Sequence, residues 1–399
     1  MVTIDPFQAQ RYVLRDYQYR IERLEKRLAL TPTQAQITAA ATATVFPGRN
    51  VLDNGAMNTT QRGVGPVTGI AVTGYYTADR WKAYMSTPGT GVFSQDVIAD
   101  APVSTLFTNS LRMKTTTVNA SPATTMEINL SQSVEGFNCQ QFMIGTPNAT
   151  AITVQFWVKS SITGVFNVEL YNPAGPRYVS KQYTIPVPDT WSFVTVTFPP
   201  DAFGTAPPNT SASGLSLQWF LGNGTDETSG IQTGLWGATP ANRAVLNTNL
   251  LATLNATWQI TGVQMEVGVN ATPFEVIPYA DRLARCQRTY FRVTGTAAAG
   301  VLTSLGTAYT TSAGYFSVTP PVRMRAIPTL ATSGTATDYR LTDGATGTTC
   351  TGVPSLNGDT TVDQLMVIAS TAATLTQFRP YYLASNLTAN AFLGFSADL

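Results

Sequence analysis

ITVQFWVKSSITGVFNVELYN, residues Ile152–Asn172, decides the fold class of this chain. Val154, Phe156 and Val158 alternate with more polar neighbours, which is the pattern of a β-strand with one buried face. A short Thr-Gly break ending at Gly164 separates this run from VFNVELYN, in which the alternation resumes. We therefore predict two antiparallel strands that pair with each other across the break.

The same texture extends over residues 48–279. The runs WSFVTVTF, LSLQWFLG and WQITGVQMEVG begin at Trp191, Leu215 and Trp258, and Gly, Pro and Asn cluster between them. Many antiparallel strands in one segment predict a sandwich or a barrel, and long excursions between strands favour a jelly roll. We predict a mainly β protein with a central jelly-roll β-sandwich at residues 48–279.

The composition limits what the chain can do. Charged residues make up 12% of its 399 residues, about half the usual share of roughly 25%. Thr, Ser, Asn, Gln and Gly must therefore cover most of the surface, which is typical of an all-β exterior protein rather than of a cytosolic enzyme. The net charge of +1 gives no field that would attract nucleic acid or a membrane, so neither is expected as a partner.

Residue types needed for several kinds of chemistry are missing. The sequence has no His, so it cannot form the common Cys/His zinc sites or a Ser–His or Cys–His nucleophile. Cys139, Cys286 and Cys350 are far apart, and we expect free buried thiols, with one long-range disulfide as the alternative. There is no phosphate-binding loop or dinucleotide-binding glycine motif, so no cofactor is predicted.

Residues 1–30 carry a heptad pattern. Mostly apolar residues recur every seven positions in two series, which together define the a/d seam of a coiled coil. The seam comprises Phe7, Leu14, Tyr17, Ile21, Leu24 and Leu28. A lone helix of this length is marginal in water, so we predict that it forms a homotrimer and docks onto another protein. The alternative is an amphipathic helix packed on its own domain. Pro32 ends the helix, and residues 31–47 read as a linker.

The run ITGVQMEVGVNATPFEVIPYADRLARCQRTY (Ile260–Tyr290) reads as a strand, a turn and a connecting helix at residues 280–292. Its two glutamates could be close in space, and paired carboxylates are what glycoside hydrolysis requires. The helix, however, has one apolar face and arginines on the other side. We therefore predict a salt-bridged joint between two domains rather than a catalytic pair. The joint residues are Glu266, Glu275, Arg282 and Arg285.

Residues 293–399 read as a separate small β domain. YFSV begins at Tyr315, TPPVRMRAIPTL at Thr319, DQLMVIAS at Asp363 and TLTQFRPYYLAS at Thr374, with Gly/Asp-rich turns between them. With about a hundred residues, the domain can fold alone or within an intertwined trimer.

Several motifs occur in a fixed order. They are NVLDNGAMNTTQRG from Asn50, YTADRW from Tyr76, TGVQME from Thr261 and CQRTY from Cys286. The ordered set resembles a recurrent module of bacteriophage fibre and tail proteins, which itself resembles jelly-roll carbohydrate-binding modules. The chain's final FLGFSADL also resembles the end of such virion proteins. The resemblance implies a trimeric or multimeric virion appendage without enzymatic activity in this module.

One departure from the resemblance concerns metal. Jelly-roll carbohydrate-binding modules often hold a structural calcium through an acidic residue after the first Asn-Gly and another in the last strand. Here Ala56 follows Asn54-Gly55, and Gly262 lies where the second acid would be expected. Calcium needs several converging oxygen ligands, so we predict no metal site.

Taken together, these features predict a phage virion fibre subunit that adheres to a host-surface glycan and docks through its N-terminus onto another virion protein. It would be made in the host cytoplasm without a signal peptide and would act on the particle. One alternative is a purely structural virion part, such as a head fibre or tail adaptor. A second is a glycan depolymerase, which the few carboxylates and the absence of long parallel β-helix repeats argue against.

Two surfaces are candidates for the glycan. The glycine-rich loop from Gly230 carries Trp236, with Asn242 and Arg243 nearby, and loops carry function more often than strands do. The alternative for Trp236 is a buried loop anchor. The C-terminal domain offers a second set of candidates: Tyr309, Tyr339 and Asp343.

The heptad seam can be tested with Leu24→Asp. This change buries a carboxylate in every helix of the predicted bundle, so we expect the trimer to dissociate or to lose its attachment to the virion. Light scattering on the purified chain measures the mass of the assembly. An unchanged trimer that still docks would show that the helix is not a seam.

Overall fold

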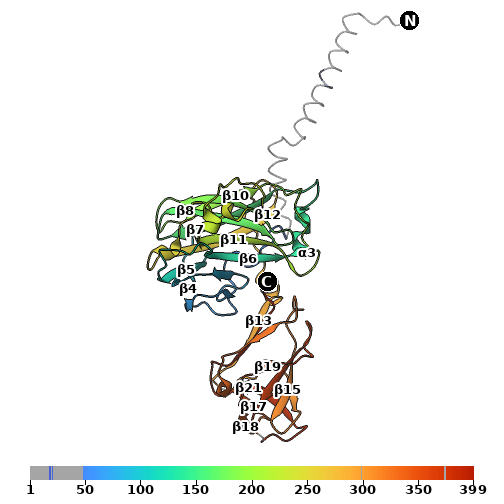
Figure 1. Cartoon of the computed structure of the whole chain (residues 1–399). Coiled ribbons are helices and arrows are strands. Elements are labelled where there is room, and N and C mark those ends of the chain that lie inside the picture. Colours follow the sequence, from blue (N-terminus) through green and yellow to red (C-terminus); the bar gives the residue numbers. More distant parts are fainter. Residues whose placement is uncertain (1–17, 19, 21–47, 298, 373) are drawn as a thin grey trace, which may run out of the picture. The chain divides into compact units, whose positions relative to one another are not determined.

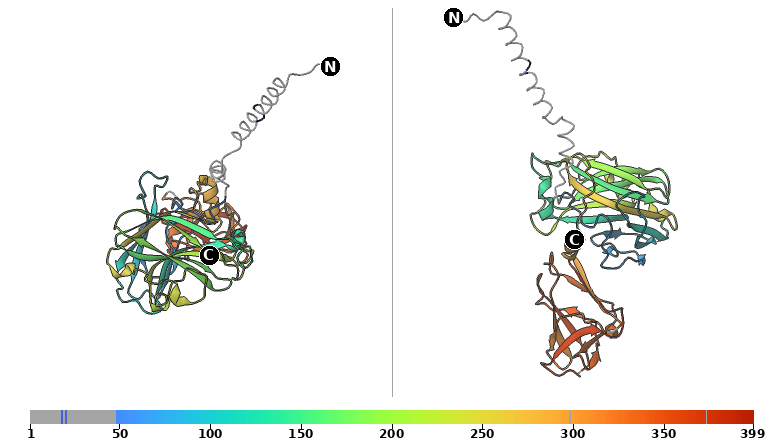
Figure 2. Two further views of the ribbon diagram at one scale, coloured as in Figure 1. Left: turned by 90° about the horizontal axis from the view of Figure 1, so that it is seen from above. Right: turned by 180° about the vertical axis from the view of Figure 1, so that it is seen from behind.

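The computed structural model describes residues 18, 20, 48–297, 299–372 and 374–399. Residues 1–47 form one unit of the chain and Gly48–Leu399 the other. The predicted linker and the predicted seam residues lie outside the described residues, so the coiled coil stays a prediction. Gly48–Leu399 is mainly β, as predicted, and is built from antiparallel sheets around two hydrophobic cores (Figures 1 and 2).

The first core lies between two six-stranded antiparallel sheets. The first sheet has the order β1 (Val67–Ile70), β4 (Val92–Ile98), β5 (Ser110–Thr117), β12 (Thr257–Val267), β7 (Ile152–Ser160) and β10 (Ser192–Phe198). The second sheet has the order β2 (Gly74–Tyr75), β3 (Lys82–Ser86), β6 (Glu127–Glu135), β11 (Ser213–Asn223), β8 (Gly164–Asn172) and β9 (Arg177–Ile185). Two packed sheets with crossover connections confirm the predicted sandwich and are consistent with a jelly roll.

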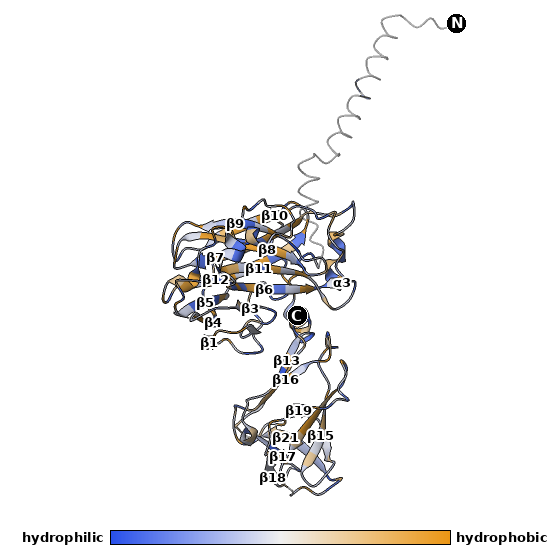
Figure 3. Ribbon diagram, in the orientation of Figure 1, coloured by the Kyte–Doolittle hydropathy of each residue, from blue (hydrophilic) through white to orange (hydrophobic). Residues whose placement is uncertain are grey.

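Alternation along the strands builds this core. In β6 the apolar residues Ile128, Leu130 and Val134 belong to the first core and alternate with polar ones, and the buried Gln132 is the one polar member of their series (Figure 3). Three fully buried aromatic side chains meet at the centre of the core. Trp219 lies 5.6 Å from Trp81 and 5.4 Å from Phe156, measured between ring centroids. The tilted and edge-to-face geometries of these pairs are the favoured ones for aromatic rings.

The predicted pairing of the two runs in Ile152–Asn172 is wrong. β7 pairs with β12 and β10 in the first sheet, whereas β8 pairs with β11 and β9 in the second. The chain therefore crosses from one sheet to the other at the turn before Gly164. Alternation shows which face of a strand is buried, but both sheets bury a face on the same core, so the pattern cannot name the partner strand.

The opening motif Asn50–Gly63 is a mostly buried segment without regular secondary structure. The side chain of Asn50 donates to the carbonyl of Val263 and accepts from the N–H of Met265, which fixes the segment against β12. Asn54 has a positive φ of 53° and its amide makes four bonds to the backbone around it. At Gly55 a Cβ would collide with the carbonyl oxygen of Val263, so only glycine fits there.

The connecting helix is shorter than predicted. Helix α5 spans Tyr279–Gln287, and strand β13 (Tyr290–Thr294) begins soon after it because these residues pair in register with β22 (Phe392–Ser396). The predicted apolar face is buried only at its C-terminal end, since Tyr279 is 61% exposed whereas Cys286 is fully buried. All three cysteines of the chain are free and buried, which confirms that prediction.

The second core lies within the C-terminal residues, between a three-stranded sheet and a seven-stranded sheet. The three-stranded sheet has the order β13, β22 and β16 (Thr329–Ala331). The seven-stranded sheet has the order β18 (Gly347–Thr349), β17 (Tyr339–Thr342), β21 (Pro380–Ser385), β14 (Gly306–Ala308), β15 (Ala313–Val318), β20 (Leu365–Ser370) and β19 (Ser355–Leu356). Most of the run from Thr319 is irregular because its prolines remove backbone donors.

Short helices occupy the connections. They are α3 (Gly136–Cys139), η1 (Gln140–Phe142), α4 (Thr225–Thr228), η2 (Pro240–Asn242), η3 (Leu250–Ala252) and η4 (Ala336–Asp338). In the described part of the chain, no helix has both the length and the apolar character needed to cross a bilayer.

Trp219→Ala tests the central core. It removes a buried indole that packs on two other rings, and such changes cost about 3–5 kcal/mol. We expect a fall of that size in the free energy of unfolding, measured with urea on the full chain. Phe203→Ala is the control, because its ring is 92% exposed and surface changes stay within about 0.5 kcal/mol. Equal losses in both variants would contradict the core assignment.

Candidate binding groove

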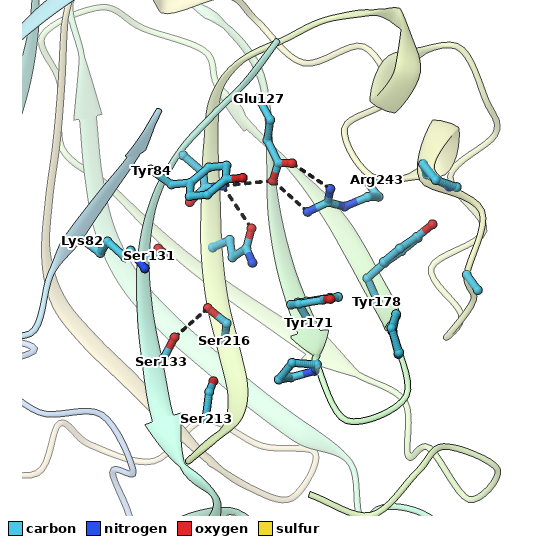
Figure 4. A pocket seen from close by; sticks show the side chains of 16 residues that line it. Lys82, Tyr84, Glu127, Ser131, Ser133, Tyr171, Tyr178, Ser213, Ser216 and Arg243 are labelled. Atoms are coloured by element: carbon cyan, nitrogen blue, oxygen red, sulfur yellow. Dashed lines mark hydrogen bonds and ion pairs between the residues drawn. The ribbon is translucent and has the colours of Figure 1, made fainter. Parts of the chain in front are cut away.

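A groove of about 430 Å³ opens on the outer face of the second sheet (Figure 4). The alternation that sends one set of side chains into the core leaves the other set here, so the floor consists of the outward-facing residues of β3, β6, β11, β8 and β9. The lining comprises Lys82, Tyr84, Glu127, Asn129, Ser131, Ser133, Tyr171, Pro173, Pro176, Tyr178, Ser213, Ser216, Gln218, Ala238, Pro240 and Arg243.

Strand register aligns one row of polar side chains across the sheet. Lys82 on β3 lies opposite Ser131 on β6, and Ser131 lies opposite Gln218 on β11. Gln218 in turn lies opposite Glu169 on β8, and Glu169 lies opposite Ser180 on β9. Side chains at directly opposed positions are about 4.5–5.5 Å apart at their Cβ atoms, so the row is continuous.

A second row runs beside the first. Ser133 on β6 lies opposite Ser216 on β11, and their hydroxyl oxygens are 3.3 Å apart. Ser216 lies opposite Tyr171 on β8, which lies opposite Tyr178 on β9. The row therefore changes from hydroxyl groups over the middle of the sheet to two phenol rings over its far side.

The tyrosines form the two sides of the groove. Figure 4 shows Tyr84 on one side and Tyr171 and Tyr178 on the other, with serine side chains between them. Strands β6 and β11 separate β3 from β8, so the two sides are roughly 14 Å apart, at three strand spacings. Tyr84 and Tyr171 are half-buried, which leaves part of each ring free to contact a ligand.

Arg243 closes one end of the groove. Its guanidinium bridges two strands by donating to Glu127 on β6, at 2.9 and 3.0 Å, and to Glu169 on β8, at 2.8 and 3.2 Å. It also lies over the rings of Phe220 and Tyr178, 5.3 and 5.2 Å from their centroids. These contacts hold the loop that follows η2 against the sheet face.

The carboxylates around Arg243 have unusual acidity. Burial raises the pKa of Glu169 to about 6, although Arg243 acts in the opposite direction. Burial also raises the pKa of Glu227, 4.0 Å from Arg243, to about 7. Burial would lower the pKa of Arg243 itself, but Glu169 and Glu127 raise it above its ordinary value. The cluster therefore contains one permanent cation and carboxyl groups that titrate near neutral pH.

The loop residues predicted to bind a glycan have different positions. Arg243 lines the groove. Asn242 accepts from the N–H of Ile231 at 2.9 Å and closes its own loop. Trp236 is partly buried against the first core, and its Nε1 donates to the carbonyl of Pro199 at 2.7 Å. Trp236 thus anchors the loop, which is the alternative considered from the sequence.

The C-terminal candidates do not form one site. Tyr339 is fully buried, and its hydroxyl donates to the carbonyl of Phe392 at 2.7 Å, so a glycan cannot reach its ring and this assignment is corrected. Asp343 accepts hydrogen bonds from its own turn and pairs with Arg379 at 2.7 Å. Tyr309 is 58% exposed and packs on Tyr315, with ring centroids 5.2 Å apart.

The four residues predicted to form the interdomain joint have other partners. Glu275 accepts from the N–H groups of Gly48 and Asn50, and Glu266 accepts from Thr272. Glu275 therefore fixes the start of the opening segment, and Glu266 lies 3.8 Å from Arg49 at the same place rather than pairing with α5. Arg282 packs over the ring of Tyr279, and Arg285 lies 4.0 Å from Asp53. The predicted salt bridges between these two glutamates and these two arginines are therefore wrong.

Asp79, from the motif YTADRW, is the centre of the actual joint. Its carboxylate is fully buried and accepts from the N–H of Gln61 at 3.1 Å and from its Nε2 at 2.6 Å. The same Nε2 donates to the carbonyl of Tyr290 at the start of β13. Arg62 lies 3.9 Å from Asp79, pairs with Asp398 and packs over the Tyr290 ring at 3.5 Å.

Sequence reasoning missed most of the groove residues. Lys82, Tyr84, Tyr171 and Gln218 all stand at outward positions of alternating strands, where the pattern marks them only as exposed. The one sequence feature that could have indicated the groove is the occurrence of Tyr171 and Tyr178 among the polar positions of two consecutive strands. Using it required the strand order, which the sequence does not specify.

No protein-family model and no curated protein matches this chain. Among solved structures it resembles the enzymatically active domain of bacteriophage CBA120 tailspike protein 4, at 13% identity and a TM-score of 0.30, over 56% of this chain and 22% of that one. It also resembles the xylan-binding domain CBM22-1 of Paenibacillus barcinonensis Xyn10C, at 13% identity and a TM-score of 0.27, over 56% and 96% of the two chains. A family 11 carbohydrate-binding module of Clostridium thermocellum gives 13% identity and a TM-score of 0.25, over 52% and 95%. Because these TM-scores lie below 0.5, they add no argument about function.

The Arg243 cluster predicts a pH-dependent stability. Burial raises the pKa of Glu227 from 4.5 to about 7, so between these values the folded protein binds more protons than the unfolded chain. Stability therefore falls as pH rises through this window. Glu169 and Asp79 shift in the same direction, to about 6. We expect Glu227→Gln, which stays neutral, to melt at a higher temperature than the wild type at about pH 8.

The difference between Glu227→Gln and the wild type should disappear below about pH 4, where Glu227 is protonated in both the folded and the unfolded protein. Scanning calorimetry at the two pH values measures it. Asp363→Asn is the matched control, because its carboxylate lies on the surface, with 60% of the side chain exposed. A Glu227→Gln variant that melts below the wild type at high pH would show that the ionised carboxylate stabilises the fold.

Proposed function

We propose that this chain binds an oligosaccharide in the groove on the second sheet. The observation that carries the proposal is the combination of tyrosine rings on both sides with a floor of hydroxyl and amide groups. Sugars present apolar C–H patches, which flat aromatic faces cover, and hydroxyl groups, which amides and acids bind. Tyr84 and Tyr171 supply the rings, and Ser131, Ser216 and Gln218 supply polar groups between them.

A second cleft of about 410 Å³ on the outer face of the first sheet fits a sugar less well. Two pairs of aromatic rings line it, Trp157 with Phe193 and Phe107 with Phe274. Gln155 is among its few polar groups, and its amide already donates to the carbonyl of Thr272. This cleft has the aromatic surface for a sugar but little hydrogen-bonding capacity.

The proposal extends to the biological role. The chain acts as a subunit of a phage virion fibre, attached through its N-terminal residues to another virion protein and trimerised by them, and it adheres to a host-surface glycan. Support comes from the ordered motifs of the sequence, since the two that contain Gln61 and Asp79 meet in one hydrogen-bonded joint. The alternative, a purely structural virion part, requires no ligand in the groove.

Binding without hydrolysis is part of the proposal. Glycoside hydrolysis needs one carboxyl group to act as an acid and another as a base or nucleophile on opposite sides of a bond. Glu127 and Glu169, at the end of the groove, instead bind the same guanidinium of Arg243. Two carboxyl groups that bind one guanidinium do not stand on opposite sides of a bond in the groove.

Tyr171→Ala tests the proposed groove. It removes a half-exposed ring from the groove without opening the core, so we expect the fold to persist and glycan affinity to fall about tenfold, which corresponds to about 1.4 kcal/mol. Glycan-array binding and adsorption to host cells measure the loss, and Tyr84→Ala should behave alike. Tyr309→Ala is the matched control, an exposed tyrosine of the C-terminal domain that should bind normally.

Two results would contradict the proposal. If Tyr309→Ala alone reduces adsorption, the C-terminal domain carries the binding site. If no variant changes adsorption and the wild type binds no glycan on the array, the chain is a structural fibre component.

A further inference from the structure

The floor of the groove has hydrogen-bonding capacity that the protein does not use. Gln218 is 8% exposed, and its Oε1 accepts from Nδ2 of Asn129 at 3.1 Å. This bond fixes which end of the amide faces which way. The two N–H groups of its Nε2 have no acceptor among the described residues, so they are free to donate to a ligand in the groove.

Ser131 lies between Gln218 and a second hydrogen-bond donor, Lys82. It stands directly opposite Gln218 on one side and Lys82 on the other, and its hydroxyl has no hydrogen-bond partner in the described part of the chain. Lys82 to Gln218 spans two strand spacings, roughly 10 Å, so a single sugar unit with its substituents can reach all three groups. Figure 4 shows the Lys82 ammonium turned toward Ser131.

Lys82 supplies a positive charge to this row. Its ammonium has three N–H donors, and one of them binds the carbonyl oxygen of Leu399 at 3.3 Å. Asp398, the acid that acts on its pKa, is itself paired with Arg62. Burial lowers the pKa of Lys82, against the effect of Asp398. A partly buried cation of this kind gains from an anionic partner.

The acceptors that border the row are already occupied. Glu127 accepts from Arg243 and from Asn129, and the Oε1 of Gln218 also accepts from Asn129. Oδ1 of Asn129 lacks a donor, but it is covered from solvent. The groups left for a ligand are therefore an ammonium, a hydroxyl and an amide NH₂, which all donate. A carboxylate, which only accepts, is their chemical complement.

We infer that the groove takes an acidic oligosaccharide, whose carboxylate lies over Ser131 between Lys82 and Gln218 while neighbouring sugar rings pack on the tyrosines. The inference rests on the proposed glycan-binding function and names its ligand class. It assigns specificity to Lys82 and Gln218, with Ser131 between them. The cluster at Arg243 shapes the end of the groove, but its one guanidinium is already bound by three glutamates and is not available to the ligand.

The test uses the full chain and a panel of uronic-acid and sialic-acid oligosaccharides, each beside its carboxyl-reduced, neutral form. We expect binding to the acidic forms, a loss of about tenfold or more on carboxyl reduction, in line with a charge-assisted bond, and weaker binding as ionic strength rises. Equal or better binding of the neutral forms would overturn the inference and leave the proposed function intact. Binding to neither form would overturn both.

Two substitutions locate the carboxylate. Gln218→Glu keeps the shape and the bond from Asn129 but replaces the NH₂ group by an oxygen that repels the ligand, so acidic binding should fall about tenfold or more while thermal melting shows an intact fold. Lys82→Gln should lose acidic binding to a similar degree and bind the reduced forms as before. Lys159→Gln is the matched control, because Lys159 lies on β7 of the first sheet and pairs with Asp100. Acidic binding that is unchanged in both groove variants would place the carboxylate elsewhere and overturn the assignment.

Discussion

The buried carboxylate of Asp79 is the contact on which the arrangement of Gly48–Leu399 depends. It binds the backbone and side chain of Gln61, and the same side chain holds the first residue of β13 through the carbonyl of Tyr290. The next two residues extend this fixation into the jelly roll. Arg80 binds Asp53 and the carbonyl of Ser133 on β6, and Trp81 packs in the first core. Three consecutive side chains thus join the irregular opening segment, the second sheet and the C-terminal domain, which gives a physical reason for these motifs to occur together.

The groove follows from the same strands that build the core. Each strand of the second sheet has an inner series, such as Leu217 and Trp219 on β11, and an outer series, such as Ser216 and Gln218. Antiparallel register then places outer residues from distant parts of the sequence side by side. The polar, aromatic and charged character of the groove is therefore set by positions that contribute nothing to the first core, so these positions can be substituted while the sandwich is retained.

The sequence predicts the features that depend on local pattern, but not those that depend on contacts between residues far apart in the chain. The strands, their buried faces and the free cysteines follow from local alternation and composition. The partner of β7 did not, because β8 buries its face on the same core from the other sheet. Tyr339 looked like a turn residue beside Asp343, yet its position in β17 carries the ring into the second core. Glu275 was assigned to the arginines of the connecting helix, but it binds the backbone of Gly48 and Asn50, which are far away in sequence.

The C-terminal residues of the second core reach the groove directly. Arg325 holds the carbonyls of Ala397 and Asp398 and, with its other nitrogen, the carbonyl of Ser211 just before β11. Lys82, inside the groove, holds the carbonyl of Leu399. The lining of the groove and the C-terminal domain are thus not mechanically independent. A tensile force on the C-terminal domain would therefore also load the bond between Lys82 and Leu399, so tension would be felt in the lining of the groove.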